Sequence, residues 1–251
     1  MLELERVSKS FGGLAVVQEL SFSIAAGTRA ALIGPNGAGK TTVFNLISGA
    51  FPLDRGRILL DGRDITAVAS RHRVRMGLAR SFQNIRLMPH LTVLENLLIG
   101  QNFRANSWRD LLKPIRLMRN NPWVEEARAE LARAGLEKYS DQSVAQLPYG
   151  LRKLIEVVRA LLARPRMLLL DEPTAGLNEA ERRDLLRFLL AVCESGVTLC
   201  VVEHDMQFIS GLCDHVIVLN FGIKIAEGRP EAVRAHPQVI AAYLGQEEVH
   251  A

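Results

Sequence analysis

A glycine-rich stretch at residues 34–42 contains the residue types that bind phosphate. It reads G-P-N-G-A-G-K-T-T and fits the pattern G-x-x-x-x-G-K-[ST], with Gly34, Gly39, Lys40 and Thr41 at the defining positions. Glycines let the backbone curl so that successive N–H groups point at phosphate oxygens, and a following helix N-terminus adds positive charge. The spacing predicts that Lys40 contacts the β and γ phosphates of a nucleotide and that the Thr41 hydroxyl holds Mg²⁺.

This chemistry requires a strand before the loop and a helix after it. The apolar run at residues 30–33 predicts a buried strand, and the apolar positions between residues 43 and 47 give the next segment one buried helical face. Glycine turns between a strand and a helix also occur without a ligand, but Lys-Thr at this spacing favours nucleotide binding. The residues expected to contact the nucleotide here are Asn36, Gly37, Ala38, Gly39, Lys40, Thr41 and Thr42.

A second apolar run ends in two carboxylates. Residues 167–170 are Met-Leu-Leu-Leu, and Asp171 and Glu172 follow them. Carboxylates at the C-terminal end of a parallel strand lie in the crevice where α/β proteins bind ligands. Beside a phosphate loop, we expect Asp171 to bind Mg²⁺, directly or through water, and Glu172 to orient and polarise the attacking water. Acidic pairs at strand ends also serve as turn or cap residues, an alternative that the phosphate loop weakens.

Three further side chains have positions from which they could reach a bound nucleotide. Phe11 lies beside two glycines and could stack on a base or pack into a sheet. Gln83 follows a short apolar-alternating segment, where its amide could reach a metal or water, or be an ordinary loop residue. His204 follows a strand predicted at residues 197–202 and could donate to the γ-phosphate, although such histidines are more often structural. Taken alone, the residues leave these roles open.

Composition limits the class of protein. The chain has 251 residues, of which 48% are hydrophobic, enough for one large α/β unit or a main domain with a lobe. No apolar run approaches the ~20 residues of a membrane-spanning helix. The N-terminus lacks the apolar region of a secretory signal, so we expect a soluble protein.

The net charge of +4 comes mainly from basic residues at 71–75 and 104–119. Such runs could contact nucleic acid or anionic lipid head groups, but they are more often solvated faces. We therefore predict no nucleic-acid partner. The three cysteines form no C-x-x-C pair and are expected to be buried thiols in a reducing compartment; they are Cys193, Cys200 and Cys213.

Turn signals and periodicity outline the remaining elements. The first part of the chain predicts short strands at residues 2–7, 15–17 and 20–24, and the basic run predicts a helix within 66–77. Helical spacing dominates residues 94–140. Two helix starts are marked by caps, Asn121 before Pro122 and Asn178 before Glu181.

Taken together, these features resemble the ATP-binding-cassette transporter ATPases over nearly the full length of the chain. Residues 34–42 match the Walker A motif, and residues 167–172 match the Walker B motif with its catalytic glutamate. Gln83 matches the Q-loop, His204 the switch histidine and Phe11 the base-stacking aromatic. The resemblance implies an α/β fold: a P-loop NTPase core with a mostly parallel sheet, an N-terminal antiparallel β subdomain and an inserted helical lobe.

The resemblance also implies a division of the chain. Residues 1–251 form a single ATP-binding-cassette domain. Residues 1–93 and 164–251 are expected to form the β subdomain and the RecA-like core. Residues 94–163 are expected to form the helical lobe with its signature loop.

The signature loop departs from the family pattern. Leu147, Pro148, Tyr149 and Gly150 lie where L-S-G-G-Q belongs, a loop that in this family acts in trans on the nucleotide of a second subunit. Pro148 replaces the serine, so both the hydroxyl and the backbone N–H donor are lost. Leu151 replaces the terminal glutamine. In addition, Asn178 stands where many family members have an aspartate, in the D-loop.

The resemblance implies ATP and Mg²⁺ as cofactors, with Thr41, Gln83 and Asp171 at the metal. It implies ATP hydrolysis that energises a membrane importer from the cytoplasmic face of the inner membrane. Residues 79–87 and 92–96, together with the Tyr-Leu-Gly ending at 243–245, resemble the ATPases of branched-chain amino acid uptake. Urea-type importers and lipopolysaccharide-export ATPases share parts of this pattern.

The implied partners are a second ATPase subunit, integral-membrane permease subunits and, indirectly, a substrate-binding protein. Because Pro148 weakens one signature loop, we predict a heterodimer with two unequal sites, in preference to a homodimer. A nucleotide-binding regulatory subunit that does not hydrolyse ATP is the alternative.

Overall fold

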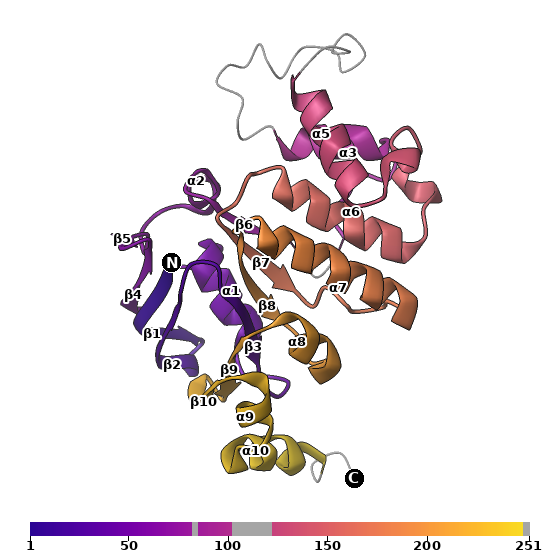
Figure 1. The fold of residues 1–251 in the computed structure, drawn as a ribbon. Coiled ribbons are helices and arrows are strands. Elements are labelled where there is room, and N and C mark those ends of the chain that lie inside the picture. The colour runs from indigo at the N-terminus through magenta and orange to yellow at the C-terminus, as the bar shows by residue number, and fades with distance from the viewer. Residues whose placement is uncertain (82–84, 102–121, 248–251) are drawn as a thin grey trace.

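A six-stranded sheet forms the centre of the computed structural model, which describes residues 1–81, 85–101 and 122–247 (Figure 1). The strand order is β10-β9-β3-β8-β7-β6, and only β10 pairs antiparallel with its neighbour. The strands are β3 (Arg29–Ile33), β6 (Leu78–Arg80), β7 (Met167–Asp171), β8 (Thr198–Val202), β9 (His215–Asn220) and β10 (Ile223–Gly228).

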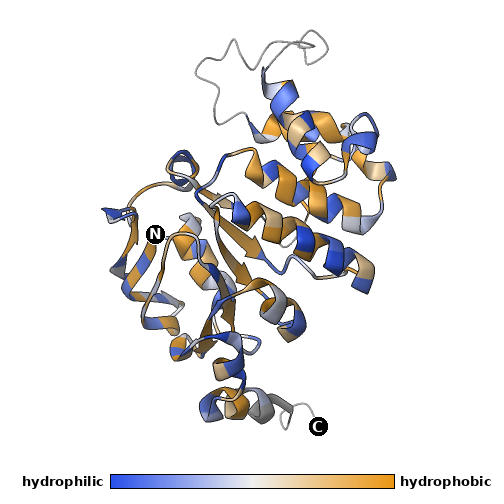
Figure 2. Cartoon of the chain, viewed as in Figure 1, coloured by the Kyte–Doolittle hydropathy of each residue, from blue (hydrophilic) through white to orange (hydrophobic). Residues whose placement is uncertain are grey.

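Both faces of this sheet are buried, as expected for a parallel sheet covered on two sides. Alternate residues of one strand enter different cores. Met167 and Leu169 of β7 pack into the core shared with the N-terminal sheet, while Leu168 and Leu170 pack into the core on the opposite face. In Figure 2 the central strands are accordingly hydrophobic along their length.

A smaller antiparallel sheet flanks the central one, in the order β2-β1-β4-β5. Its strands are β1 (Leu2–Phe11), β2 (Leu14–Ile24), β4 (Arg55–Leu60) and β5 (Arg63–Asp64). The three short strands expected before residue 25 are therefore wrong, because two long strands occupy this region. Irregularities in register, with Arg6 and Glu19 at φ 45 and 44, interrupt the alternation of the side chains without ending the strands.

Helix α1 (Lys40–Ser48) lies in the core between the two sheets. Its apolar face is fully buried against them, as the spacing predicted, through Val43, Phe44, Leu46 and Ile47. The helix ends at Gly49, which adopts φ 76 and donates its N–H to the last turn. This packing fixes the helix whose first residues are Lys40 and Thr41.

Further helices cover the opposite face and extend away from it (Figure 1). Helices α6 (Tyr149–Leu161), α7 (Glu179–Glu194) and α8 (Met206–Leu212) share the second core with α3 (Val93–Gly100) and α5 (Pro122–Arg133). Short 3₁₀ turns occur at Glu137–Tyr139 and Val144–Gln146. The remaining helices are α2 (Ser70–Arg75), α9 (Pro230–Arg234) and α10 (Pro237–Glu247). Across the described parts of the chain, no helix combines the length and apolarity needed to cross a membrane.

The basic run at residues 71–75 lies on a helix, α2, within residues 66–77 as predicted, but one of its side chains differs from the prediction. Arg73 is buried rather than solvated, because its guanidinium donates to the carbonyls of Leu46 and Ile47 at the end of α1. The second basic run, at 104–119, and the predicted cap Asn121 lie outside the described residues.

The register of the central sheet places the ends of three strands side by side. Val202 of β8 is the partner of Leu32 in β3 and also of Asp171 in β7. Because parallel strands end at the same edge, the loop after β3 and the carboxylates at the end of β7 lie at one edge of the sheet, on either side of β8. The predicted α/β fold class is thus confirmed.

Candidate functional site

The loop between β3 and α1 has a backbone shape that requires glycine at two positions. Gly34 adopts φ 152, and a Cβ there would collide with the carbonyl oxygen of Leu219 on β9. Gly39 adopts φ 97, and a Cβ there would lie 2.9 Å from the carbonyl oxygen of Val16. Gly39 is also the N-cap of α1 and has no side chain to cap it. The first N–H groups of this helix are therefore available to an anion.

Lys40 folds back over the loop that it follows. Its Nζ donates to the carbonyl oxygens of Gly34 at 2.6 Å and Pro35 at 2.9 Å. Burial lowers the pKa of Lys40, an effect that the nearby carboxylates of Glu172 and Asp171 partly offset. A phosphate bound in this loop would accept hydrogen bonds from Lys40 Nζ in place of these two backbone carbonyls.

A pocket of about 240 Å³ collects the predicted phosphate-binding residues. Glu172 lines this pocket as well, so the phosphate loop and the second carboxylate face one space. The residues from the loop and α1 are Asn36, Gly37, Ala38, Gly39, Lys40, Thr41 and Thr42. The structure therefore brings together the two motifs that the sequence separates by about 130 positions.

Asp171, the last residue of β7, is buried and only half satisfied. Its Oδ2 accepts a hydrogen bond from Arg80 at 2.8 Å, whereas its Oδ1 has no hydrogen-bond partner among the described residues. Thr41 lines the same neighbouring cavity as Asp171. A buried carboxylate oxygen without a donor, near a threonine hydroxyl, suits a hard cation such as Mg²⁺.

Glu172 adopts a backbone conformation that is rare for a residue with a side chain. Its φ is 45, in the left-handed region. Two contacts hold it: its N–H donates to the carbonyl of Val202 at 2.9 Å, and its carbonyl accepts from Lys153 of α6 at 3.1 Å. This residue, which lines the phosphate-loop pocket, thus has a strained and fixed backbone, a feature typical of functional sites.

His204 follows the end of β8 and is anchored through its backbone. Its N–H donates to the carboxylate of Glu203, which is fully buried and also accepts from the N–H and hydroxyl of Thr174. The His204 side chain is 70% exposed and is not among the residues that line the phosphate-loop pocket. The structure thus places His204 at the same sheet edge as the carboxylates but outside that pocket.

The predicted signature loop begins α6. Pro148 is the N-cap, with no side-chain hydrogen bond, and Leu147 before it is buried. Gly150 packs so closely on Glu181 of α7 that a Cβ would collide with that carboxylate. Tyr149, 40% exposed, lies against Gly176. None of the four predicted signature residues lines the chain's own phosphate-loop pocket.

Phe11, another predicted residue, stands apart from the pocket. Phe11 ends β1, is 42% exposed and packs edge-on against Phe51 with ring centroids 5.4 Å apart. Lys9 lies over the same ring. Gln83 lies outside the described residues.

Sequence reasoning missed three charged residues that hold the site together: Arg80, Lys153 and Glu203. All three side chains are largely buried and bond to groups far away along the chain. A charged residue inside an otherwise apolar helical or strand pattern was the available signal. The pattern does not reveal which distant atom satisfies the charge.

Comparison with known proteins assigns this geometry to a family. The family model described as "ABC transporter" matches residues 17–175, which include the phosphate loop, the signature loop and both carboxylates. The chain belongs to the ABC transporter family. A second model, described as "Branched-chain amino acid ATP-binding cassette transporter", matches residues 224–249 of this ABC family member.

Curated ABC relatives align with the chain from end to end. The high-affinity branched-chain amino acid transport ATP-binding protein BraF of Pseudomonas aeruginosa is 38% identical, with 98% of each chain covered. The corresponding protein LivG of Escherichia coli K12 is 35% identical over the same shares. Among solved structures, the ADP conformation of MJ1267, an ATP-binding cassette of an ABC transporter, superimposes with a TM-score of 0.88. It is 32% identical and 98% of each chain is covered.

Proposed function

We propose that this chain is the ATP-hydrolysing subunit of a membrane importer for branched-chain or related amino acids. One observation supports hydrolysis above all: Glu172 lines the same pocket as the phosphate loop. The amino-acid substrate is supported by the BraF and LivG relatives, which are named as branched-chain amino acid transport proteins and match the whole chain. The family alone would fit a urea or lipid-export system equally well.

Nucleotide binding begins at the phosphate loop. The N–H groups of Gly37, Gly39 and the first turn of α1 bind the phosphates, and Lys40 exchanges its carbonyl partners for phosphate oxygens. Phe11 stacks on the base. Its edge-on packing against Phe51 leaves part of the ring exposed for this contact.

Thr41, Asp171 and Gln83 would hold the magnesium ion. When bound, Mg²⁺ neutralises charge on the phosphates. The Oδ1 atom of Asp171, buried and without a donor among the described residues, is the natural ligand on the protein side.

Glu172 orients and polarises the water that attacks the γ-phosphate in line, and His204 donates to that phosphate. Catalysis then comes from positioning and charge stabilisation, with no covalent intermediate. The unusual backbone of Glu172, fixed by Val202 and Lys153, limits the positions that its carboxylate can take.

A second ATPase subunit completes each site. The residues at 147–150 do not line this chain's own pocket. They act on the nucleotide of the partner, and the partner's signature loop acts on the nucleotide of this chain. The pair docks on integral-membrane permease subunits at the cytoplasmic face of the inner membrane. A substrate-binding protein takes part indirectly, and nucleic acid does not.

The test of this proposal is Glu172→Gln in the complex with the partner subunits. Removing the carboxylate should lower ATP turnover by about 100-fold or more, because the water loses its polarising group. ATP binding, measured with a fluorescent ATP analogue, should stay within about twofold. Glu179→Gln is the matched control, since that carboxylate is exposed at the start of α7. Turnover near the wild-type rate in Glu172→Gln would remove Glu172 from this role.

A regulatory subunit that binds but does not hydrolyse ATP is the second candidate. Pro148 favours it, since an N-cap without a side-chain hydrogen bond offers a γ-phosphate neither hydroxyl nor N–H. ATP turnover of the complex with the partner subunits distinguishes the regulatory subunit from the hydrolysing one. If Glu172→Gln leaves total turnover unchanged while the partner's equivalent variant abolishes it, this chain is regulatory.

A further inference from the structure

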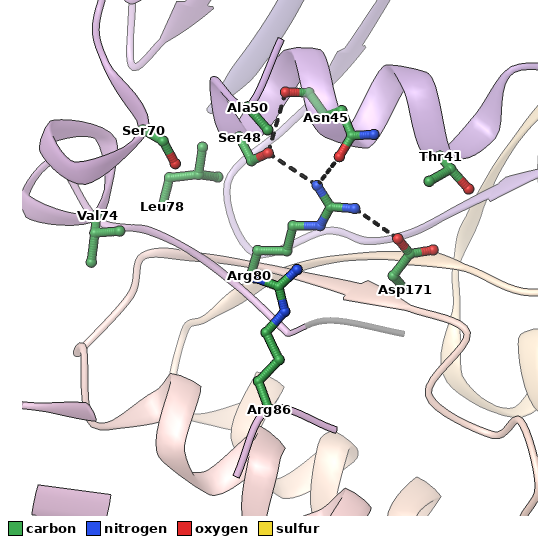
Figure 3. Close-up of a pocket in the computed structure, with 10 residues that line it drawn as sticks. All are labelled: Thr41, Asn45, Ser48, Ala50, Ser70, Val74, Leu78, Arg80, Arg86 and Asp171. Atoms are coloured by element: carbon green, nitrogen blue, oxygen red, sulfur yellow. Dashed lines mark hydrogen bonds and ion pairs between the residues drawn. The ribbon is translucent and has the colours of Figure 1, made fainter. Parts of the chain in front are cut away.

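A cavity of about 570 Å³ lies beside the phosphate loop, next to the two carboxylates. Thr41, Asn45 and Ser48 of α1 line it, together with Arg80 at the end of β6 and Asp171 at the end of β7. Figure 3 shows the Arg80 guanidinium between α1 and the Asp171 carboxylate. Arg80 thus joins the phosphate-loop helix to the strand that ends in the predicted metal ligand.

Helix α1 holds this guanidinium in one place. The Nη1 atom donates to Asn45 Oδ1 at 2.7 Å and to Ser48 Oγ at 3.1 Å. The ring of Phe44 lies beneath it, 5.7 Å from the guanidinium carbon to the ring centroid. Its Nη2 atom donates to Asp171 Oδ2 at 2.8 Å. A planar fork with several donors can make these contacts at once, and a lysine cannot.

The ion pair is shielded from water. The Arg80 side chain is 9% exposed and that of Asp171 is 3% exposed. Arg80 therefore occupies one carboxylate oxygen and leaves the other, Oδ1, without a donor among the described residues. In Figure 3 the second oxygen points away from Arg80.

The charges around this oxygen are not net negative. Lys40 and Arg80 face the two carboxylates Asp171 and Glu172, and a third cation, Arg86, lines the same cavity. A divalent cation that enters alone meets no net negative charge, and at this burial the guanidinium repels it with little screening. The phosphates of a nucleotide add the missing negative charge.

We propose that Arg80 is a positioning residue that makes metal binding at Asp171 depend on bound nucleotide. It presents a single carboxylate oxygen to the metal and cancels the charge that would otherwise attract a free divalent cation. This inference rests on the proposed binding of ATP with Mg²⁺. Arg80 lies outside the motifs, three positions before Gln83. Through it, the metal binds together with or after the nucleotide and not before it.

The experiment measures metal binding to the full chain without nucleotide. Mn²⁺ serves as the probe, since electron paramagnetic resonance counts the unbound ion. Arg80→Met removes the charge but keeps an apolar stem over Phe44, and we expect it to bind Mn²⁺ about tenfold tighter than wild type. Arg80→Lys keeps the charge and should stay within about threefold of wild type in this titration.

Arg73→Met is the matched control, because Arg73 is also buried and bonds to α1 but makes no contact with Asp171. It should leave Mn²⁺ affinity unchanged. Arg80→Gln, which can still donate to Asp171, replaces Arg80→Met if the latter does not fold. Circular dichroism checks folding for each variant.

A second readout is the factor by which Mg²⁺ strengthens binding of a fluorescent ATP analogue, relative to binding in EDTA. Because coupling is reciprocal, this factor should fall in Arg80→Met by about as much as free Mn²⁺ affinity rises. Unchanged Mn²⁺ affinity in both Arg80→Met and Arg80→Gln, or an equal rise in Arg73→Met, overturns the inference. If Mg²⁺ does not strengthen binding of the ATP analogue to wild type, the proposed function fails instead of this inference.

Discussion

Four charged side chains around the end of β7 set the chemistry at the residue scale. Lys40 and Arg80 are held by backbone and side-chain acceptors, and Asp171 and Glu172 by the edge of the sheet. The phosphate loop and the carboxylates could be predicted because each motif is local in sequence. Arg80 could not, since its partners lie 32, 35 and 91 residues away. Only the fold brings such residues together.

Cys200 gives a prediction for the effect of pH on stability. Burial raises the pKa of this thiol from 9.0 to about 12. The folded thiol thus stays protonated where the unfolded thiol ionises, so its stabilising contribution is complete below pH 9 and is lost as pH rises towards 12. Between pH 8 and 10.5, this single thiol should lower the free energy of unfolding by about 2 kcal/mol.

Urea unfolding of wild type and Cys200→Ala at both pH values measures this effect. The variant is expected to be less stable at each pH, because it leaves a small cavity in β8, but its loss of stability between the two pH values should be about 2 kcal/mol smaller. Val201→Ala is the control, because it also opens a cavity in β8 but removes no titratable group, so it should keep the pH dependence of wild type. Equal pH dependence in wild type and Cys200→Ala would contradict the prediction.

At the element scale, the start of α7 carries both stability and the contact with the signature loop. Asn178 caps the helix: its Oδ1 accepts from the Glu181 N–H at 3.0 Å, and Glu181 Oε2 accepts from the Asn178 N–H at 2.9 Å. Glu181 also packs against Gly150 in the signature loop. The capping box therefore couples the helix start to the loop that we propose acts in trans.

Asn178→Ala should lower the free energy of unfolding by about 1 kcal/mol, because the Glu181 N–H loses its acceptor. Asn178→Asp should stay within about 0.5 kcal/mol of wild type, since a carboxylate caps equally well and favours a helix N-terminus. Chemical denaturation at pH 7 compares the two variants. Equal destabilisation by alanine and aspartate would show that the cap is not what Asn178 contributes.

Elements marked by local signals were predicted well. The cap of α7, the buried face of α1 and the strand before Asp171 all lie where the sequence indicated. The N-terminal strands were not, because side-chain alternation cannot distinguish an irregularity in register from the end of a strand. The basic run was predicted to be a solvated face, but Arg73 of α2 turns inward to bind α1, a contact that only the fold reveals. The helical lobe at 94–163 remains a prediction as a separate unit.

For the whole molecule, the proposed dimer has two sites of different strength. The site with this chain's Lys40, Asp171 and Glu172 faces the partner's signature loop. The reciprocal site is closed by Pro148, which lacks both donors of a serine. Each lost donor to a phosphate in a closed site costs about 1.5–3 kcal/mol. The second site should therefore turn over ATP slowly even when both subunits bind nucleotide.

Pro148→Ser should raise turnover at that second site alone. The backbone at Pro148, φ −52 and ψ 153, suits a serine N-cap, so the substitution should fold and place a hydroxyl and an N–H at the start of α6. Glu172→Gln abolishes hydrolysis at the first site. In that background, adding Pro148→Ser should raise the residual ATP turnover of the heterodimer about tenfold over Glu172→Gln alone. Pro148→Ala, which restores the backbone N–H but not the hydroxyl, is the matched control and should raise turnover less than Pro148→Ser. No rise in the Glu172→Gln background, or full cooperative activity from a homodimer of this chain alone, would mean that Pro148 does not make the sites unequal.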